Sequence, residues 1–450
     1  MLILEEKLHL PSIKEELSSA SAGIILLGFY FLFEFGSLQG LYSEIMRPLR
    51  LPFILAVSTL FYALFVLVFR NRSVTPLVSR SFLIYILFVL IYGLITTRDP
   101  LTRVNSTKLF ISYLEYYIVM TYAVKSLNSF LLLIDIWLAS VAYSSLHGIL
   151  QGGLVWGNQW LSDENQFSLL LSTAVPVSYF LFLNSKIMIK KACYLFCLSL
   201  YVIGIVASTS RGGFLALAVA GLFIWALGKH KIKTIMIFIT AVILAYSFAP
   251  PQFFSEIKTI GEGAKERTAN ERTYLWSLAC KMFLDKPVLG VGISNYPEFV
   301  DIYDNKAENR FSSAVNWKGT LYVAHSTPFT ILAEGGIVQV LLIVFLMAVI
   351  YKNWKKINRY IRCFDKEHQK SAVITFIANL NNALFIAMLS YWIGASFITV
   401  DLFPFFWVLT MFSLVFFNIA EATLIEYEEQ LMAEADLDIS GQFNLETSNK

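Results

Sequence analysis

Long apolar runs without a single charge recur along this chain, and they limit its fold more than any other feature. The 17 residues between Arg80 and Arg98 carry no charge, and neither do the 19 residues from Ala192 to Ser210. A helix of about 17–25 mostly apolar residues spans the hydrocarbon core of a bilayer. At that depth every backbone N–H and C=O group needs a partner, which a helix provides within itself. The runs do not alternate as β-barrel strands do, so we expect an all-α polytopic membrane protein.

The composition agrees with this expectation. Hydrophobic residues make up 57% of the chain and charged residues only 15%, with a mean hydropathy of +0.63. Such a chain of 450 residues is too apolar for a soluble domain. The net charge of +3 is too small to indicate nucleic-acid binding. We therefore expect membrane lipids, and no nucleic acid, among its partners.

About twelve apolar segments reach the length of a spanning helix or come within one residue of it. They place a transmembrane domain over residues 1–420 and an acidic tail over residues 421–450. The tail is expected to be a cytoplasmic helix that ends in disorder. The expected spans are 18–36, 51–69, 81–97, 109–125, 130–150, 165–184, 192–210, 213–228, 234–250, 329–351, 373–396 and 403–420.

The distribution of positive residues orients these segments. With both termini in the cytoplasm, the inner loops carry seventeen Lys and Arg residues and the short outer loops carry six. Positive residues favour the cytoplasmic side of a membrane, so this orientation is preferred to its reverse. The six outer residues are Arg47, Arg50, Arg98, Arg103, Lys108 and Arg211.

One long hydrophilic stretch, residues 250–327, falls on the outer face in this orientation. A stretch of this length inside a compact protein is usually functional or disordered. Residues 270–284 have the apolar period of an amphipathic helix, and the following Asp285-Lys286-Pro287 is typical of a helix end. We therefore expect a partly helical outer loop that contributes to a functional site.

Arg211 lies between two uncharged runs, within the segment STSRGG of residues 208–213. A charge at such a place in a membrane protein is costly and marks a functional candidate. Glycines permit close approach of the backbone to a ligand, and the next helix begins here with N–H groups that favour an anion. Together with the arginine fork, these features predict a phosphate-binding site at the outer membrane surface. The alternative is an arginine that only marks the interface.

Two further arginines, Arg267 and Arg272, lie at the start of the amphipathic segment. For Arg267, a solvated basic face and a substrate-binding role remain equal alternatives. Arg272 has Trp276 one helical turn later, on the side of the apolar face. This placement would turn its guanidinium toward the membrane, so Arg272 is the stronger candidate for binding an anionic substrate.

His325 is the only histidine expected on the outer face near the mouth of a helix. An imidazole with a pKa near 6.5 can accept or orient a hydroxyl proton at neutral pH. A helix-capping or interfacial role is the alternative. Glu334 falls in the first turns of the next expected helix, where an unpaired carboxylate is costly. It is therefore a supporting candidate and an expected partner of one of the arginines.

No metal or nucleotide site stands out in the sequence. Glu44 is the only acid of the first outer loop, and Asp301 and Asp304 of the long loop are more simply solvated carboxylates. Cys193 and Cys197 are four residues apart but have no His or carboxylate beside them. The chain has no P-loop, dinucleotide fingerprint or GxSxG motif. We expect a site built from arginines and one histidine, with no metal and no cofactor.

Four short stretches resemble the O-antigen ligase family, whose relatives include O-antigen polymerases and bacterial O-oligosaccharyltransferases. They occur in the order typical of that family and lie within residues 160–345. Relatives often have Asn directly after the histidine that corresponds to His325, where this chain has Ser326. The stretches are Asp163-Glu164-Asn165-Gln166-Phe167 with Pro176; Ser210-Arg211-Gly212-Gly213; Arg272-xxx-Trp276 with Asp285-Lys286-Pro287-Val288-Leu289-Gly290-Val291-Gly292; and Ala324-His325-Ser326 with Ala333-Glu334-Gly335-Gly336.

The resemblance implies a GT-C-like glycosyltransferase in the bacterial inner membrane, with its active face in the periplasm. The donor would be a glycan on undecaprenyl diphosphate, and the transfer would be inverting and metal-independent. Arg211 and Arg272 match the diphosphate-binding arginines of the family, and His325 matches its histidine that activates the acceptor hydroxyl. The acceptor would be lipid A-core, another glycan or a protein.

Three alternatives stay open beside a ligase. A polymerase would extend one lipid-linked glycan with another, and a protein O-oligosaccharyltransferase would use a Ser or Thr side chain as acceptor. A transporter is the weakest alternative, because transporters tend to have internal repeats, broken helices and charges near the midplane of the membrane. Here only Glu115 comes near a midplane, and the main polar residues lie at the outer surface.

Overall fold

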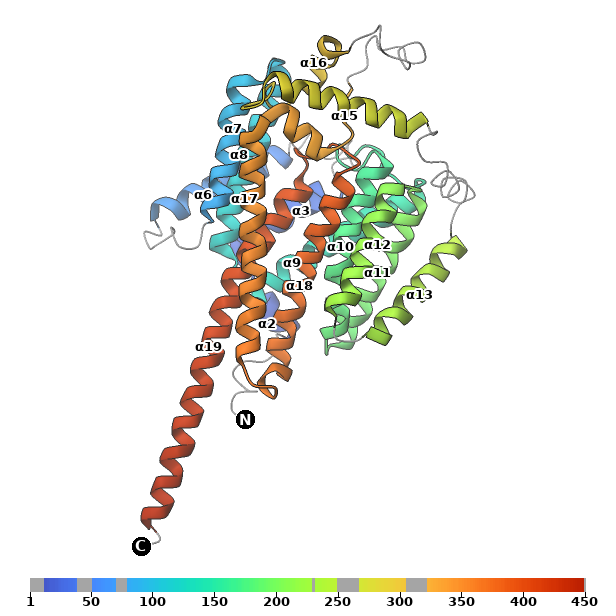
Figure 1. Cartoon of the computed structure of the whole chain (residues 1–450). Coiled ribbons are helices and arrows are strands. Elements are labelled where there is room, and N and C mark those ends of the chain that lie inside the picture. The colour runs from blue at the N-terminus through green and yellow to red at the C-terminus, as the bar shows by residue number, and fades with distance from the viewer. Residues whose placement is uncertain are drawn as a thin grey trace.

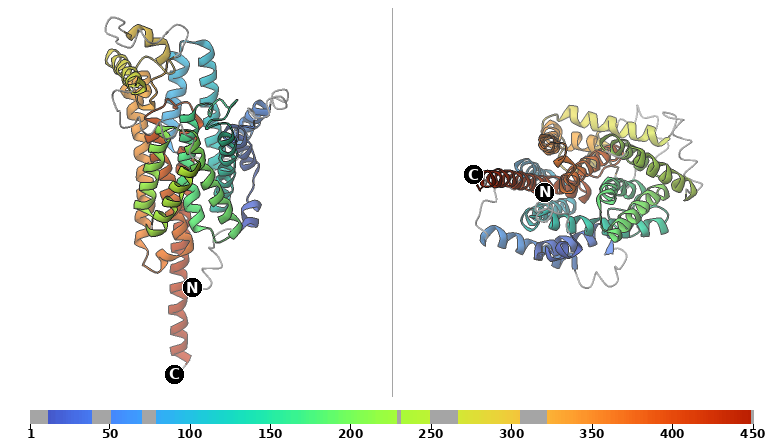
Figure 2. Two further views of the ribbon diagram at one scale, coloured as in Figure 1. Left: turned by 90° about the vertical axis from the view of Figure 1, so that its right-hand side faces the viewer. Right: turned by 90° about the horizontal axis from the view of Figure 1, so that it is seen from below.

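The computed structural model describes residues 12–38, 51–69, 79–228, 231–248, 267–304 and 322–448. Within these ranges the chain forms helices and no β-strand. Most of the helices run side by side in one bundle, seen in Figure 1 and from two further directions in Figure 2. The expected all-α class is therefore confirmed for the described part of the chain.

A helix lies over each of the twelve segments that were expected to span a membrane. Among the described residues, six of these helices are long and apolar enough to cross a bilayer, namely α9, α10, α11, α17, α18 and the part of α19 up to Ala433. The chain is thus a multi-pass membrane protein, whereas the number of twelve spans stays a prediction. The twelve helices are α3 (Ala22–Glu34), α6 (Leu51–Phe69), α7 (Arg80–Thr96), α8 (Pro100–Ala123), α9 (Leu127–Leu150), α10 (Glu164–Asn184), α11 (Met188–Ala207), α12 (Arg211–Leu227), α13 (Lys231–Phe248), α17 (Thr327–Cys363), α18 (Ala372–Ala395) and α19 (Pro404–Ser448).

Two further helices, α15 (Arg267–Asp285) and α16 (Tyr296–Tyr303), lie together at one end of the bundle (Figure 1). We call this end of the bundle the α15 end. α15 lies across the bundle, and its buried apolar face packs with residues of α16 and of the turn between the two helices. The short helix α2 (Ile13–Ser18) and the end of α19 lie toward the opposite end, as does η2 (His368–Lys370) between α17 and α18. The amphipathic helix predicted at 270–284 and its end at Asp285 are thus confirmed.

The helix α10 forms the centre of the bundle, because every residue from Phe167 to Leu181 is buried. It packs against α9, α11, α12 and α18. The hydroxyl groups of Ser168, Ser172 and Thr173 donate to the backbone of the same helix, as Thr173 Oγ1 does to Leu170 O at 2.7 Å. These three hydroxyl groups are therefore satisfied inside an apolar bundle. The fixed central helix holds the residues at its start, Asp163 to Asn165, in a defined position.

The C-terminal helix α19 continues to Ser448 and projects beyond the rest of the bundle (Figure 1). Glu421 of this helix forms an ion pair with Lys356 near the end of α17. Tyr427 contacts Phe364 edge to face, with 5.6 Å between the ring centroids. The tail that was expected to end in disorder is instead helical to Ser448, because it extends a span that already provides the helix nucleus.

Candidate functional site

The helix α17 is broken near its start, where Gly336 has a left-handed φ of 59°. The turn that follows α15 docks at this break, and Val291 N donates to Ala333 O at 2.9 Å. A Cβ atom at Gly336 would lie 2.6 Å from Val288 O, so this approach of the two backbones needs glycine. Two of the stretches singled out in the sequence, residues 285–292 and 333–336, therefore contact each other directly.

Glu334 lies next to this break, and its side chain is buried, with a relative exposure of 3% for the residue. Its carboxylate accepts the N–H groups of Ser294 at 2.7 Å and of Tyr296 at 2.9 Å. Such N–H groups at the start of a helix have no partner within the helix itself. The expected arginine partner is not among the described contacts of Glu334. The carboxylate holds the start of α16 through these two backbone N–H groups.

His325 lies just before α17 and has a φ of 47°, in the left-handed region that residues other than glycine seldom adopt. Hydrogen bonds on both sides of it hold the chain in place. Trp276 Nε1 of α15 donates to Ala324 O at 3.0 Å, and Thr327 N donates to Ile398 O at 2.9 Å. The side chain of His325 remains exposed. A strained backbone at an exposed, titratable residue is typical of a functional position.

Arg211 is the first residue of α12 and is half-buried. The preceding Ser210 caps this helix by accepting the N–H of Gly213 at 3.1 Å, and its hydroxyl donates to Asn165 Oδ1 at 2.8 Å. A Cβ atom at Gly213 would lie 2.3 Å from the Cβ of Ser168, so glycine lets α12 approach α10 closely. The helix start expected at Arg211 is confirmed, and it lies beside the start of α10.

Charged residues on α15 and just before α10 change the pKa of His325. Arg272 and Glu271 belong to α15, and Asp163 precedes α10. His325 is an exposed residue, yet the protein packed around its imidazole removes part of the hydration of the ring. This burial is the main cause that lowers the pKa of His325 below 6.5, and the positive charge of Arg272 adds to it, while Asp163 and Glu271 oppose the shift. At neutral pH the imidazole is therefore uncharged and able to accept a proton.

The structure thus gathers most of the predicted site residues. Arg272 and His325 act on each other, Arg272 also acts on Glu164 at the start of α10, and Arg211 begins the helix that is tied to α10 through Ser210. Arg267 begins α15, but its side chain lies outside the described residues, so its role stays a prediction.

Some residues of this region received no role from the sequence. Asp163 and Asn165 stood in a family-like stretch, which was the available signal. Thr399, between α18 and α19, gave no local signal. Its hydroxyl accepts the N–H of Ser326 at 3.3 Å and bonds with the hydroxyl of Thr330 at 3.1 Å. A loop distant in sequence therefore supports the segment that carries His325.

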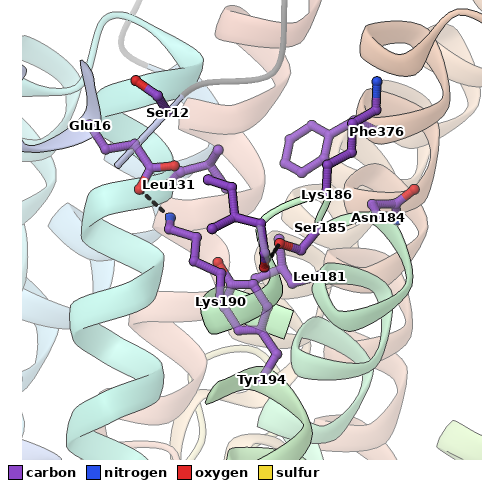
Figure 3. Close-up of a pocket in the computed structure, with 11 residues that line it drawn as sticks. Ser12, Glu16, Leu131, Leu181, Asn184, Ser185, Lys186, Lys190, Tyr194 and Phe376 are labelled. Carbon is purple, nitrogen blue, oxygen red and sulfur yellow. Dashed lines mark hydrogen bonds and ion pairs between the residues drawn. The ribbon is translucent and has the colours of Figure 1, made fainter. Parts of the chain in front are cut away.

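A cavity of about 250 Å³ lies elsewhere, between α2, α9, α10, α11 and α18 (Figure 3). Lys190 on its wall forms an ion pair with Glu16 and donates to Asp135 Oδ2 at 2.8 Å. Two carboxylates already balance this ammonium group, which makes the wall a poor site for a phosphate. The cavity is lined by none of the four family-like stretches. We therefore place the candidate site at the α15 end and not in this cavity.

The residues at the α15 end suit one kind of chemistry. An arginine and a helix start that carries a second arginine bind phosphate oxygens well. A neutral imidazole beside them can take a proton from a hydroxyl group. Within the described ranges, no three His, Cys, Asp or Glu side chains are grouped as ligands for a metal ion.

The chain resembles one known protein family over part of its length. Residues 196–346 match the family described as O-antigen ligase. The match contains Arg211, Arg272, His325 and Glu334, and it also spans the break in α17. A search among curated proteins found no match to the chain.

Proposed function

We propose that this membrane protein, in which residues 196–346 match the O-antigen ligase family, transfers a glycan from undecaprenyl diphosphate to an acceptor on the outer face of the bacterial inner membrane. The preferred acceptor is the lipid A-core. The observation that carries the proposal is that Arg272 acts electrostatically on His325, close to the start of α10, to which the helix that begins at Arg211 is tied through Ser210. The arginines that would bind the phosphates and the imidazole that would accept the proton thus belong to the same end of the bundle.

In this proposal the two arginines hold the diphosphate of the donor. A guanidinium group can donate two parallel hydrogen bonds to phosphate oxygens. The N-terminus of α12 adds backbone N–H groups and the positive end of a helix dipole. These fixed positive groups stabilise the charge that develops on the diphosphate as its bond to the glycan breaks.

His325 would activate the acceptor. Its neutral imidazole accepts the proton of an acceptor hydroxyl as the oxygen attacks the first carbon of the glycan from the face opposite the diphosphate. The new bond joins this oxygen to the carbon, and the bond from the carbon to the diphosphate oxygen breaks, so the configuration inverts. The electron pair of that bond leaves with the diphosphate, and the proton stays on His325 until water removes it. None of these steps requires a metal ion.

The proposal is tested by transfer with purified protein. We expect the protein to move a glycan from undecaprenyl diphosphate onto rough lipopolysaccharide, which ends at the core. Extension of one lipid-linked glycan by another would instead identify a polymerase, and transfer to a Ser or Thr peptide a protein oligosaccharyltransferase. Absence of transfer to all three acceptors, by protein that is folded, would contradict the proposed function.

The proposed active face predicts a definite topology. A periplasm-dependent reporter fused after Asp304, at the end of α16, should be active, and the same reporter fused after Asn358 in α17 should be inactive. The reason is the excess of positive residues in the inner loops, seventeen against six. A cytoplasmic reporter at the same two positions serves as the control and should give the reverse. Activity of the periplasmic reporter at Asn358 alone would move the α15 end to the cytoplasm.

A further inference from the structure

The indole of Trp276 joins the helix of Arg272 to the backbone of His325. Trp276 lies one turn after Arg272 on α15, and its Nε1 donates to Ala324 O at 3.0 Å. Its ring also stacks on Phe329 of α17, with 5.0 Å between centroids and an angle of 12° between the planes. The indole therefore contacts the chain on both sides of His325.

The backbone conformation at His325, next to the carbonyl that Trp276 binds, needs contacts from the rest of the protein to be maintained. The φ of 47° at His325 is unfavourable for a residue with a Cβ atom, so the surrounding contacts must maintain it. Ala324 is fully buried, at 0% exposure, and a buried carbonyl that lost its donor would be left unsatisfied. On the other side, Ser326 and Thr327 are fixed by hydrogen bonds to Thr399 and Ile398.

We propose that Trp276 is a positioning residue, which fixes the imidazole of His325 at a set distance and orientation from Arg272. The expected effect of Trp276 on glycan transfer rests on the proposed function, whereas its effect on the position of His325 does not. Because one helix carries both Arg272 and Trp276, the helix that binds the donor diphosphate also sets the place of the group that activates the acceptor. A displacement of about 1 Å at a reacting group lowers turnover on the order of 10²-fold.

Trp276→Phe keeps an aromatic ring that can stack on Phe329 but removes the N–H donor. We expect kcat to fall by roughly 10- to 100-fold, while KM for the lipid-linked donor stays near its original value, because both arginines remain. A merely structural role would lower the amount of folded protein and leave kcat per folded molecule unchanged.

The chain provides a closely matched control. Trp354 Nε1 donates to Asn382 Oδ1 at 2.9 Å, and its ring stacks on Phe385 with 4.2 Å between centroids and 14° between the planes. Trp354 lies on the same helix as Phe329, but far from His325 along that helix. Trp354→Phe removes the same kind of hydrogen bond and should leave kcat, KM and the pKa of His325 unchanged.

A second readout needs no transfer activity. Burial of the position lowers the pKa of His325 and Arg272 lowers it further, whereas Asp163 and Glu271 raise it. If Trp276→Phe no longer holds His325 in this position, burial and Arg272 should both act on the imidazole less strongly. The pKa of His325 should then rise toward 6.5. NMR titration of protein with labelled histidine measures this pKa, and His325→Ala identifies the resonance among the five histidines.

The two readouts separate the inference from the proposed function. A raised pKa together with a lowered kcat supports both, and a raised pKa in a protein that transfers no glycan supports the positioning role and contradicts the function. An unchanged pKa with an unchanged kcat overturns the positioning role. If Trp276→Phe does not accumulate as folded protein, replacement of Trp276 by benzothienylalanine, which has the shape of tryptophan without its N–H, is measured instead and judged by the same outcomes.

Discussion

Alanine at Arg211 or at Arg272 is expected to reduce glycan transfer by about 10²- to 10³-fold each, the usual effect of removing one fixed donor to a developing negative charge. Arg211 begins α12 and Arg272 acts on His325 from α15, so the two residues would hold the diphosphate from two sides. Arg→Lys at either position should also impair transfer, because lysine keeps the charge but lacks the paired N–H groups of arginine. Initial rates with a lipid-linked donor measure the effect.

Lys281 provides the control for this prediction. It lies on α15, as Arg272 does, but its side chain is exposed. Lys281→Ala removes a positive charge from the same helix and should leave the rate unchanged, which separates binding of the diphosphate from a general effect of charge. Each variant is first shown to insert and to accumulate like the original protein. Full activity of Arg211→Ala would remove the diphosphate site from the proposal.

His325→Ala should lower turnover by roughly 10²- to 10⁴-fold, the usual contribution of a general base. Binding of the lipid-linked donor should survive, because the two arginines remain. The activity of the original protein should persist in EDTA, since no step of the proposed transfer uses a metal ion. His368→Ala is the matched control, because His368 is bonded to Asp365 on the turn between α17 and α18, away from the α15 end. Loss of activity in EDTA that magnesium restores would reject this mechanism.

The pH dependence of transfer provides an independent measurement of the same group. A general base works in its deprotonated form, so activity falls as the pH falls through the pKa of His325. Because burial and Arg272 lower this pKa, the midpoint of the fall should lie below 6.5, the ordinary value for histidine. The profile of kcat/KM against pH for the free protein reports it. A midpoint above 6.5 would mean that another group is titrating or that His325 is placed differently.

The sequence by itself determined where the long helices of the bundle and the amphipathic helix α15 lie. A run such as 192–210 has no charge, and in a bilayer an uncharged run of this length can satisfy its backbone only as a helix. The period of residues 270–284 likewise predicted α15, and Asp285 ends it as expected. The helix start at Arg211 followed from the serine and glycines around it. All these features depend on residues close together in the chain, so a sequence reading can reach them.

Only the tertiary structure decided which of these residues meet. The backbone groups at the start of α16 lie next to Glu334, so this carboxylate binds N–H groups where the sequence suggested an arginine. At the break in α17, Gly336 lies against the turn that contains Val288 and Gly290, which is distant in sequence. The hydrogen bond from Trp276 to Ala324 joins two segments that nothing in the local sequence connects. Such contacts depend on the packing of whole helices, and the hydrophobic period of a helix shows which face is buried without showing against what.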